Sequence, residues 1–144
     1  MIAIDTNVLL RYLLQDDLEQ SSKAEKLIAG KHKVLITDVV LTETVWVLKG
    51  KRYNLSKEMI IDVIHALFAE PNIIFEDKYA VWGSLKDYIN ASPIRVKGKK
   101  KQADFSDALI VNKANIYGQL NGIEVSTVYT FDKAALSISG TKAP

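Results

Sequence analysis

The sequence predicts an α/β protein in which a parallel β-sheet is covered by helices on both of its faces. Short runs of consecutive apolar residues, without the polar alternation of a half-exposed strand, indicate strands that are buried on both sides. These runs alternate with longer segments of helical periodicity, and that alternation is typical of βαβ units. The 144 residues contain no internal repeat and no long linker, so we expect a single domain over residues 1–144.

The first part of the chain is expected to alternate strands and helices whose ends carry clear signals. Asp5 or Thr6 can cap the first helix, and Asp16 or Asp17 can start the second, because their side-chain oxygens accept hydrogen bonds from free backbone N–H groups. Gly30 can end the second helix. The expected strands are Ile2–Ile4, Val34–Thr37 and Asn72–Phe75, and the expected helices are Thr6–Leu14, Asp16 or Asp17 to Ala29, Asp38–Lys49 and Ser56–Ala69.

The remainder is expected to hold two longer helices, one strand and a short terminal helix. Ser92-Pro93 should end the first of these helices, because proline disfavours helical backbone at the residue before it. Gly98 and the lysines around it are expected to form a loop. The expected elements are the helices Asp77–Ala91 and Asp104 or Ser106 to Tyr117, the strand Ser126–Thr130, and a short helix from Asp132.

Composition and terminal sequence favour a soluble globular protein of the cytoplasm. Hydrophobic residues make up 48% and charged residues 25%, which are ordinary values for such a protein. No apolar stretch is long enough to span a bilayer, and Met1–Asp5 lacks the features of a signal peptide. The absence of cysteine excludes a disulfide framework and suits a reducing compartment.

The distribution of charge is more informative than its sum, because the net charge is only +2. Without one basic segment the chain would be net acidic. A local basic run beside acidic chemistry indicates a polyanionic substrate. The plainer alternative is a loop that its lysines keep solvated. The residues of this segment are Arg95, Lys97, Lys99, Lys100 and Lys101.

Acidic residues interrupt or border apolar segments at four places, namely Asp5, Glu43, Asp107 and Asp132. An ionised carboxylate removed from water is costly unless it is paired or binds a metal. No basic residue adjoins any of the four, and the economical interpretation is that they converge on Mg²⁺ or Mn²⁺. Asp5 and Asp132 each end an expected strand, where parallel sheets place their ligands.

Helical spacing supports this interpretation for two of the acids. The residues three and four positions from Glu43 are all apolar, so this carboxylate is expected to lie on a buried helix and to point into the body of the protein. Asp104 lies one turn before Asp107, and two carboxylates on one face repel each other unless a cation lies between them. Asp87, by contrast, lies among small and polar residues in an ordinary solvated position.

Each residue also has a plainer explanation when it is taken alone. Asp5, Asp104 and Asp132 could simply cap helices, and Glu43 could pair with a distant arginine. Arg11 lies one helical turn after Asn7, so it could contact a phosphate or face solvent. A single cation has the advantage that it accounts for all the acids at once.

Four segments, taken in order, resemble the motifs of PIN domains. The similarity covers nearly the whole chain, and a chain of this size without an added domain is similar to the toxin ribonucleases of VapBC toxin–antitoxin pairs. The segments are Ile4-Asp5-Thr6-Asn7-Val8-Leu9-Leu10, Thr42-Glu43-Thr44-Val45-Trp46-Val47-Leu48, Ala103-Asp104-Phe105-Ser106-Asp107-Ala108-Leu109-Ile110 and Val128-Tyr129-Thr130-Phe131-Asp132-Lys133-Ala134.

The resemblance implies a three-layer α/β/α sandwich with a four- or five-stranded parallel sheet. It implies an endoribonuclease that depends on Mg²⁺ or Mn²⁺, with an antitoxin protein as its inhibitor and a homodimer as its assembly. Asp5 and Asp107 would be the surest metal ligands, with Glu43, Asp132 and Asp104 as further acids, and Glu43 could instead orient or deprotonate the attacking water. The supporting groups would be Thr6, Asn7 and Thr130. The expected contacts to RNA do not come from the resemblance: the basic segment is expected from its charge alone, and Arg11 from its place one turn after Asn7.

Three other classes of protein share features of this sequence. A haloacid dehalogenase-type phosphohydrolase needs a second Asp two positions after the first, where this chain has Asn7. A receiver-type signalling domain needs an acidic pair at the end of the first strand, and Asp16-Asp17 comes a helix too late. A PIN-like module that binds RNA or a partner without cleaving stays as the main alternative.

Overall fold

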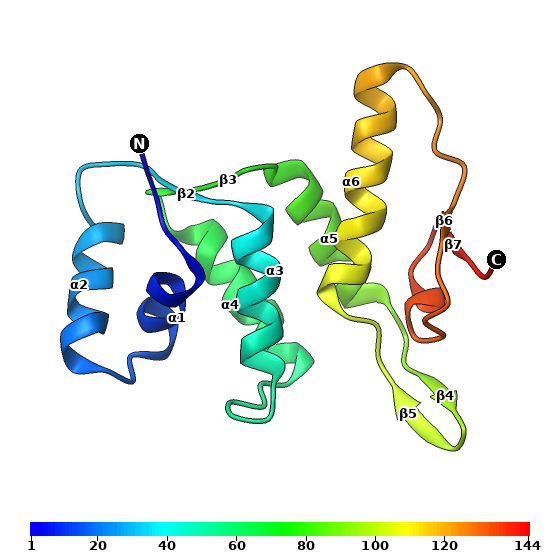
Figure 1. Ribbon diagram of the computed structural model, residues 1–144, viewed down its shortest axis with the longest axis horizontal. Helices are drawn as coiled ribbons and strands as arrows, with labels where there is room; N and C mark the ends of the chain where they lie inside the picture. Colours follow the sequence, from blue (N-terminus) through cyan, green and yellow to red (C-terminus); the bar gives the residue numbers. More distant parts are fainter. The chain divides into compact units, whose positions relative to one another are not determined.

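In the computed structural model, which describes residues 1–144, the chain divides into two units, Met1–Lys78 and Tyr79–Pro144. Short strands and longer helices alternate through both of them (Figure 1). Each unit has its own parallel strand pairing, so the expected α/β class with parallel strands is confirmed. No helix is long and apolar enough to cross a bilayer.

The first unit is built on a three-stranded parallel sheet in the order β1-β2-β3. β1 is Ile2–Ala3, β2 is Val34–Ile36 and β3 is Ile73–Phe75. Val34 pairs with Ile2 on one side and with Ile73 on the other, which fixes the register. Val34 and Ile36 are fully buried, as expected for a central strand without polar alternation. The sheet therefore carries Asp5 just beyond the carboxyl end of β1.

Four helices accompany this sheet: α1 (Thr6–Leu14), α2 (Leu18–Ile28), α3 (Asp38–Lys49) and α4 (Lys57–Ala69). The bounds of α1 and α3 are those expected from the sequence. Each helix begins after a residue whose side-chain oxygen accepts a hydrogen bond from the first turn, and this explains why the local signals placed the boundaries well. The capping residues are Asp5, Asp17, Thr37 and Ser56.

One expectation about α3 is wrong, because this helix is not buried all round. One of its faces is buried through Leu41, Val45 and Leu48, whereas Val39 and Trp46 are 72% and 76% exposed. Apolar residues fill more of the helical circumference than its packing partners cover. A sequence pattern cannot say which apolar stripe a neighbouring element will bury.

The second unit contains α5 (Lys78–Asn90), which starts at its boundary, α6 (Phe105–Asn121), and a parallel pair formed by β6 (Val128–Tyr129) and β7 (Thr141–Lys142). Tyr88 of α5 and Phe105 of α6 are both buried and meet edge to face, with ring centroids 6.1 Å apart. Ala108 and Val111 of α6 join a small apolar cluster with Ile138. The start of α6 and the C-terminal segment therefore share one core.

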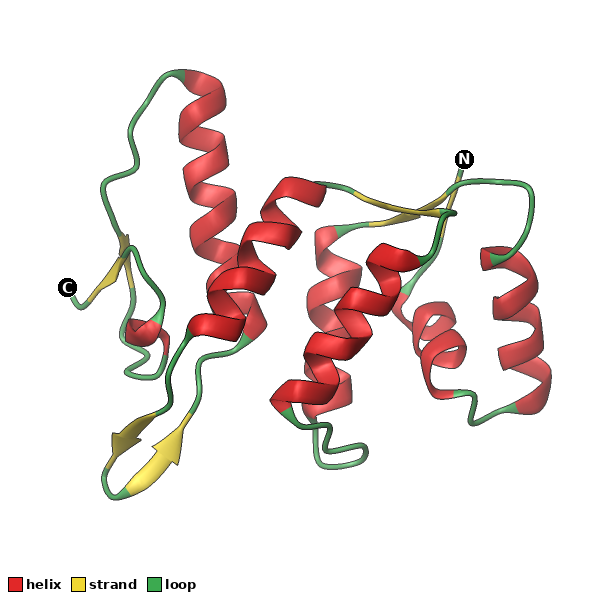
Figure 2. Cartoon of the chain, turned by 180° about the vertical axis from the view of Figure 1, so that it is seen from behind, coloured by secondary structure: helices red, strands yellow, loops and turns green.

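The basic segment forms a β-hairpin, not the expected loop. β4 (Ile94–Val96) and β5 (Lys99–Lys101) pair in antiparallel fashion, as the lower hairpin of Figure 2 shows. Lys97 and Gly98 form the two-residue connection, and both have positive φ angles, 50° and 75°. Such turns match the twist of a hairpin. The prediction of a loop is wrong because it relied on the low average occurrence of lysine in strands.

Smaller differences concern the end of the chain. α6 continues for about one turn beyond the expected Tyr117 and stops at Gly122, whose φ of 65° suits glycine. The expected helix from Asp132 is a single 3-10 turn, η1 (Ala135–Ser137). β7 was not expected, because two residues of Thr-Lys carry no strand pattern on their own.

Candidate functional site

A cleft in the first unit brings together two of the four acidic motifs. It has a volume of about 350 Å³, and its walls come from the start of α1, the middle of α3 and the residues after α3. Asp5, Thr6, Asn7 and Glu43 line it. Glu43 lies almost forty positions after the other three residues in the sequence. The parallel pairing of β1 with β2 brings the helices that follow these strands, α1 and α3, side by side.

Asp5 acts as the N-cap of α1 and also lines the cleft. Its Oδ1 atom accepts a hydrogen bond of 2.9 Å from the backbone N–H of Val8. The plainer interpretation of Asp5 as a helix cap is therefore correct as far as it goes. A capping carboxylate still has a second oxygen, and the exposed side chain of Asp5 holds it at the cleft.

Glu43 is exposed and does not point into the interior as the sequence indicated. Its flanking residues on the same helical face, Val39 and Trp46, are themselves largely exposed. The Thr6 hydroxyl donates a hydrogen bond to Oε2 of Glu43, which ties the start of α1 to the middle of α3. The supporting role of Thr6 that the resemblance implied stays a prediction, and this hydrogen bond places Thr6 in direct contact with Glu43.

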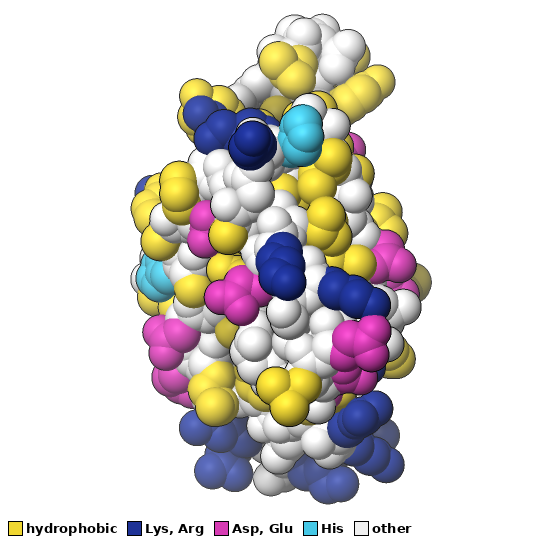
Figure 3. Space-filling view, turned by 90° about the vertical axis from the view of Figure 1, so that its left-hand side faces the viewer, with side chains coloured by type: hydrophobic (Ala, Val, Ile, Leu, Met, Phe, Trp, Pro, Cys, Tyr) yellow, Lys and Arg dark blue, Asp and Glu magenta, His cyan; other side chains and the backbone are white.

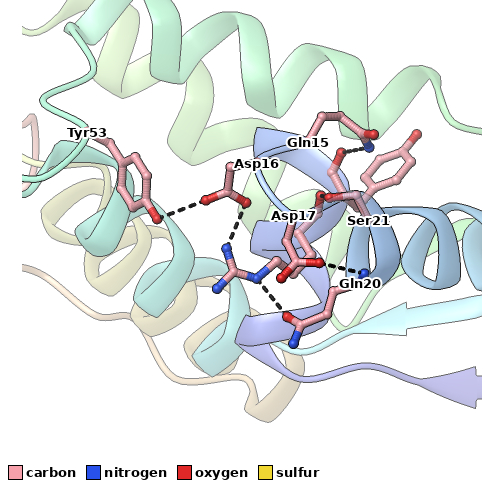
Figure 4. A network of polar contacts seen from close by, with 8 residues as sticks. Gln15, Asp16, Asp17, Gln20, Ser21 and Tyr53 are labelled. Carbon is pink, nitrogen blue, oxygen red and sulfur yellow. Dashed lines mark hydrogen bonds and ion pairs between the residues drawn. The ribbon is translucent and has the colours of Figure 1, made fainter.

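Arg11 lines this cleft and belongs to a polar network whose members Asp16, Gln20 and Tyr53 are labelled in Figure 4. Its Nη1 donates to Oδ1 of Asp16 at 2.7 Å, and its Nε donates to Oε1 of Gln20 at 2.9 Å. The hydrogen bond with Asp16 raises the pKa of Arg11, and the same bond lowers the pKa of Asp16. Arg11 therefore does not simply face solvent, because the Asp16 carboxylate compensates part of its positive charge.

Two residues of the cleft were missed by sequence reasoning, Arg52 and Tyr53. They follow Gly50, the C-cap of α3, and the guanidinium carbon of Arg52 lies 5.1 Å from the centroid of the Tyr53 ring. The available signal was a cation next to an aromatic residue at the end of the helix that carries Glu43. Nothing in the local pattern indicated that this turn folds back toward Asp5.

The second unit holds the other acidic residues, and two of them meet at the start of α6. Asp104 is the N-cap residue, and its backbone N–H donates to Oδ2 of Asp107 at 2.7 Å. A helix N-terminus favours negative charge, since its free N–H groups carry a partial positive charge. The N-terminus of α6 thus stabilises part of the negative charge of Asp104 and Asp107 without a bound cation. Their mutual repulsion is therefore weaker evidence for a metal site than the sequence indicated.

Asp132 and Thr130 form a local turn after β6. The Asp132 side chain accepts a hydrogen bond of 2.8 Å from the backbone N–H of Ala134, and its own N–H donates to the Thr130 hydroxyl at 3.0 Å. Asp132 is exposed. Thr130 therefore contacts Asp132 directly, and its role as a supporting residue stays a prediction.

Asp87 does not occupy the ordinary solvated position that the sequence indicated. It is half-buried, and its Oδ2 accepts a hydrogen bond of 2.7 Å from the side-chain amide of Asn112 on α6. This contact makes Asp87 a poor reference residue for mutational comparison. Asp62 on α4 is exposed and serves that purpose better.

The hairpin presents its basic residues on defined faces. Arg95 and Lys100 lie directly opposite each other, as do Val96 and Lys99. Directly opposed residues project to the same face of a strand pair, so Arg95 and Lys100 share a face that contains no apolar side chain. Like charges in this arrangement repel, and an anion bound between them would relieve the repulsion.

One face of the molecule, drawn in Figure 3, carries charges of both signs. Acidic and basic side chains are interspersed with apolar ones over the face of the molecule that Figure 3 shows. The net charge of +2 therefore does not arise from a uniform positive surface. Recognition of a polyanion would have to use local groups of basic residues, of which the hairpin is the clearest.

The chemistry of the acidic residues fits a hard divalent cation. Asp5, Glu43 and Asp132 form no ion pair with lysine or arginine, so their negative charge is not already neutralised. Carboxylate oxygens are the donors that Mg²⁺ and Mn²⁺ prefer. Within neither unit do three acidic or histidine side chains gather closely enough to hold a metal ion alone. The convergence of all these acids on one ion therefore stays a prediction.

The comparison with protein families agrees with the motifs. The PIN domain model matches residues 2–139, nearly the whole chain. The chain therefore belongs to the PIN domain family, whose members are generally nucleases that use divalent metal ions and bind RNA. Comparison with curated proteins gave no significant match.

Proposed function

We propose that this protein is a metal-dependent endoribonuclease that hydrolyses RNA phosphodiester bonds, and that it is the toxin of a VapBC-like toxin–antitoxin pair. Its family supports nuclease activity in general. The observation that carries the endoribonuclease proposal is the cleft that Asp5 and Glu43 both line, with the Thr6 hydroxyl bonded to Glu43, and the toxin role follows from the resemblance. We assign the whole chain to a single catalytic domain, which operates in the cytoplasm, where its RNA substrate lies.

Asp5, Asp107, Glu43, Asp132 and Asp104 would hold the Mg²⁺ or Mn²⁺ ion, with Asp5 and Asp107 as direct ligands. When bound, such an ion lowers the pKa of a coordinated water and neutralises charge on the phosphate. The chain's own groups would keep the acids in place, since capping fixes Asp5 and the turn with Thr130 fixes Asp132.

Glu43 is the best candidate to orient the attacking water and accept its proton. The bond from Thr6 restricts the Glu43 carboxylate to one side of the cleft, and restricted placement is what an efficient general base requires. Asn7 lines the same cleft and would support substrate or water through its amide.

The basic residues would bind the RNA backbone. In this proposal Arg95, Lys97, Lys99, Lys100 and Lys101 guide RNA from the hairpin, which lies only three residues before Asp104 in sequence. A chain of that length spans at most about 11 Å, so the hairpin cannot be far from the start of α6. Arg11 would take part through its Nη2 atom, which Asp16 and Gln20 leave open.

An antitoxin protein that covers the acidic cleft and a homodimeric assembly complete the proposal. Both follow from the resemblance to VapBC toxins. Exposed apolar side chains support the existence of partner surfaces, and Trp46, beside Glu43 on α3, is 76% exposed. Large exposed apolar residues in groups are typical of interaction sites.

The test is cleavage of a labelled single-stranded RNA with Mg²⁺, Mn²⁺ or EDTA. We expect cleavage with either metal, none with EDTA, and none for Asp5→Asn with metal, while Asp62→Asn cleaves normally. Asn keeps the shape of Asp and can still accept the hydrogen bond from Val8, so the fold should persist. Full activity of Asp5→Asn would refute the site, and RNA binding without any cleavage would identify the non-catalytic alternative.

A further inference from the structure

The cleft that contains Asp5 and Glu43 also contains two guanidinium groups, those of Arg11 and Arg52. The cleft is therefore lined by groups that suit a cation and by groups that suit an anion. A phosphodiester that approaches two carboxylates is repelled by them, so a fixed positive charge nearby would help to hold it. Such a charge must belong to an arginine that has no carboxylate partner within the protein.

The two arginines differ in whether a neighbouring carboxylate compensates their positive charge. Arg11 donates to the carboxylate of Asp16 and to the side chain of Gln20. Arg52 is exposed and forms no ion pair, and its one close partner is the ring of Tyr53 at 5.1 Å. A guanidinium is always charged and can bind two oxygens of one phosphate at once. Arg52 is thus the cation of this cleft whose charge is not neutralised.

Tyr53 connects Arg52 to the rest of the network in Figure 4. The Tyr53 hydroxyl donates to Oδ2 of Asp16 at 3.4 Å, a long bond, while Oδ1 of the same carboxylate accepts from Arg11. Asp16 therefore orients the tyrosine ring, and the ring in turn lies beneath the Arg52 guanidinium. A cation held over an aromatic face has lost part of its freedom before a ligand arrives, which favours binding.

We propose that Arg52 binds a backbone phosphate of the RNA in the Asp5–Glu43 cleft and that Tyr53 positions it. The bound group is a phosphodiester next to the one that is cleaved. This inference rests on the proposed function, because it names a substrate contact within the same cleft. Arg11 donates to Asp16 and Gln20, so only its Nη2 atom is left for a second contact to the RNA.

The main experiment is the binding of a single-stranded 2′-O-methyl RNA in EDTA across a salt series. EDTA removes the metal ion that the proposed cleavage requires, and the 2′-O-methyl groups protect the probe from contaminating ribonucleases that attack through the 2′-hydroxyl. The variants are Arg52→Gln, Arg52→Lys and Lys51→Gln. Lys51→Gln is the matched control, since it removes one positive charge from the adjacent exposed residue, which does not line the cleft. Thermal melts of each variant verify that the fold is unchanged.

For Arg52→Gln we expect weaker binding and a slope of log K against log[salt] that is less steep by about 0.7, the value for one phosphate contact on a single strand. Between about 50 and 200 mM salt the wild type should therefore lose roughly 2.6-fold more affinity than this variant. Arg52→Lys should keep the slope but bind more weakly, because lysine cannot form the bidentate contact. Lys51→Gln should match the wild type.

The role of Tyr53 is tested by rescue. Tyr53→Leu removes the ring and should weaken binding without changing the salt slope, because Arg52 keeps its charge. Tyr53→Phe keeps the ring and should recover most of the affinity. Equal loss in both variants would refute the positioning role, since the hydroxyl and not the ring would then matter.

The outcomes separate this inference from the proposed function. If Arg52→Gln and Lys51→Gln give lines that coincide with the wild type or that flatten equally, the phosphate contact is refuted even in an active nuclease. If the wild type binds with the expected slopes but cleaves no RNA with Mg²⁺ or Mn²⁺, the proposed function fails and the phosphate site stands.

Discussion

The faces of the hairpin give the most direct quantitative prediction about RNA binding. Arg95→Gln/Lys100→Gln and Lys99→Gln/Lys101→Gln each remove two positive charges from the same hairpin, so their long-range electrostatic effect is nearly equal. They differ in geometry, because Arg95 and Lys100 are opposed on the face without apolar residues. If that face contacts two phosphates, the two double variants should behave differently.

The expected magnitude follows from the number of contacts. Two phosphate contacts on single-stranded RNA contribute about −1.4 to the slope of log K against log[salt]. Over a fourfold change in salt, the Arg95→Gln/Lys100→Gln variant should therefore lose roughly 7-fold less affinity than the wild type. Lys99→Gln/Lys101→Gln should show a clearly smaller change, since its two side chains lie on the face shared with Val96 and Ile94.

The assay is fluorescence anisotropy with 2′-O-methyl RNA in EDTA, with amide hydrogen exchange as a measure of hairpin integrity. Removal of the opposed like charges should relieve about 0.2–1 kcal/mol of repulsion, so exchange in β4 and β5 should not become faster in Arg95→Gln/Lys100→Gln. Weaker binding therefore could not be attributed to loss of the hairpin. Equal slopes for both double variants would refute the assignment to one face, and lines that coincide with the wild type would leave the basic residues as a solvated segment.

The other predictions concern the metal, the pH dependence, the packing of α6 and the assembly. Mg²⁺ or Mn²⁺ should raise the melting temperature relative to EDTA, because a ligand at a hundredfold excess over its Kd adds about 2.7 kcal/mol to the stability, and coincident melts would contradict convergence of the acids. The bond to Arg11 lowers the pKa of Asp16 below 3.8, so the stability from this pair is present above that value and lost as the pH falls below it. An NMR titration of the Asp16 carboxyl with a midpoint at or above 3.8 would disprove the pairing. Gly118→Ala should destabilise the fold by about 1–3 kcal/mol in urea unfolding, because its Cβ would lie 2.3 Å from the carbonyl oxygen of Ile123, and an unchanged midpoint would show that this backbone yields. Light scattering at micromolar concentration should give the mass of a dimer, and a monomer would remove that part of the proposal.

Local sequence signals predicted the helices well because the interactions that start and end a helix span only a few residues. Asp5, Asp17 and Ser56 cap helices where the sequence offered them as candidates. Thr37 caps α3 although it was expected in the preceding strand. The order of the acidic motifs was also visible, and it indicated the family that the comparison found over residues 2–139.

The β4–β5 hairpin was predicted as a loop although its sequence contains a turn signal. The segment Ile94-Arg95-Val96-Lys97-Gly98-Lys99 alternates apolar and basic residues around a glycine, which is compatible with a two-residue turn. Lysine content favoured a loop because charged residues are uncommon in strands on average. An exposed hairpin does not have to bury the side chains of either strand. The low average occurrence of lysine in strands therefore did not apply to this segment.

The sequence by itself determined the α/β class, most of the helix boundaries and the identity of the acidic residues, because these depend on neighbours within one or two turns. Tertiary structure alone decided which side of α3 is buried, and so left Glu43 at a cleft instead of in the core. It also brought Thr6 to Glu43, and Arg52 and Tyr53 to the same cleft as Asp5. These contacts join residues that only the parallel pairing of distant strands makes neighbours, and no periodicity along the chain encodes a distance between two such residues.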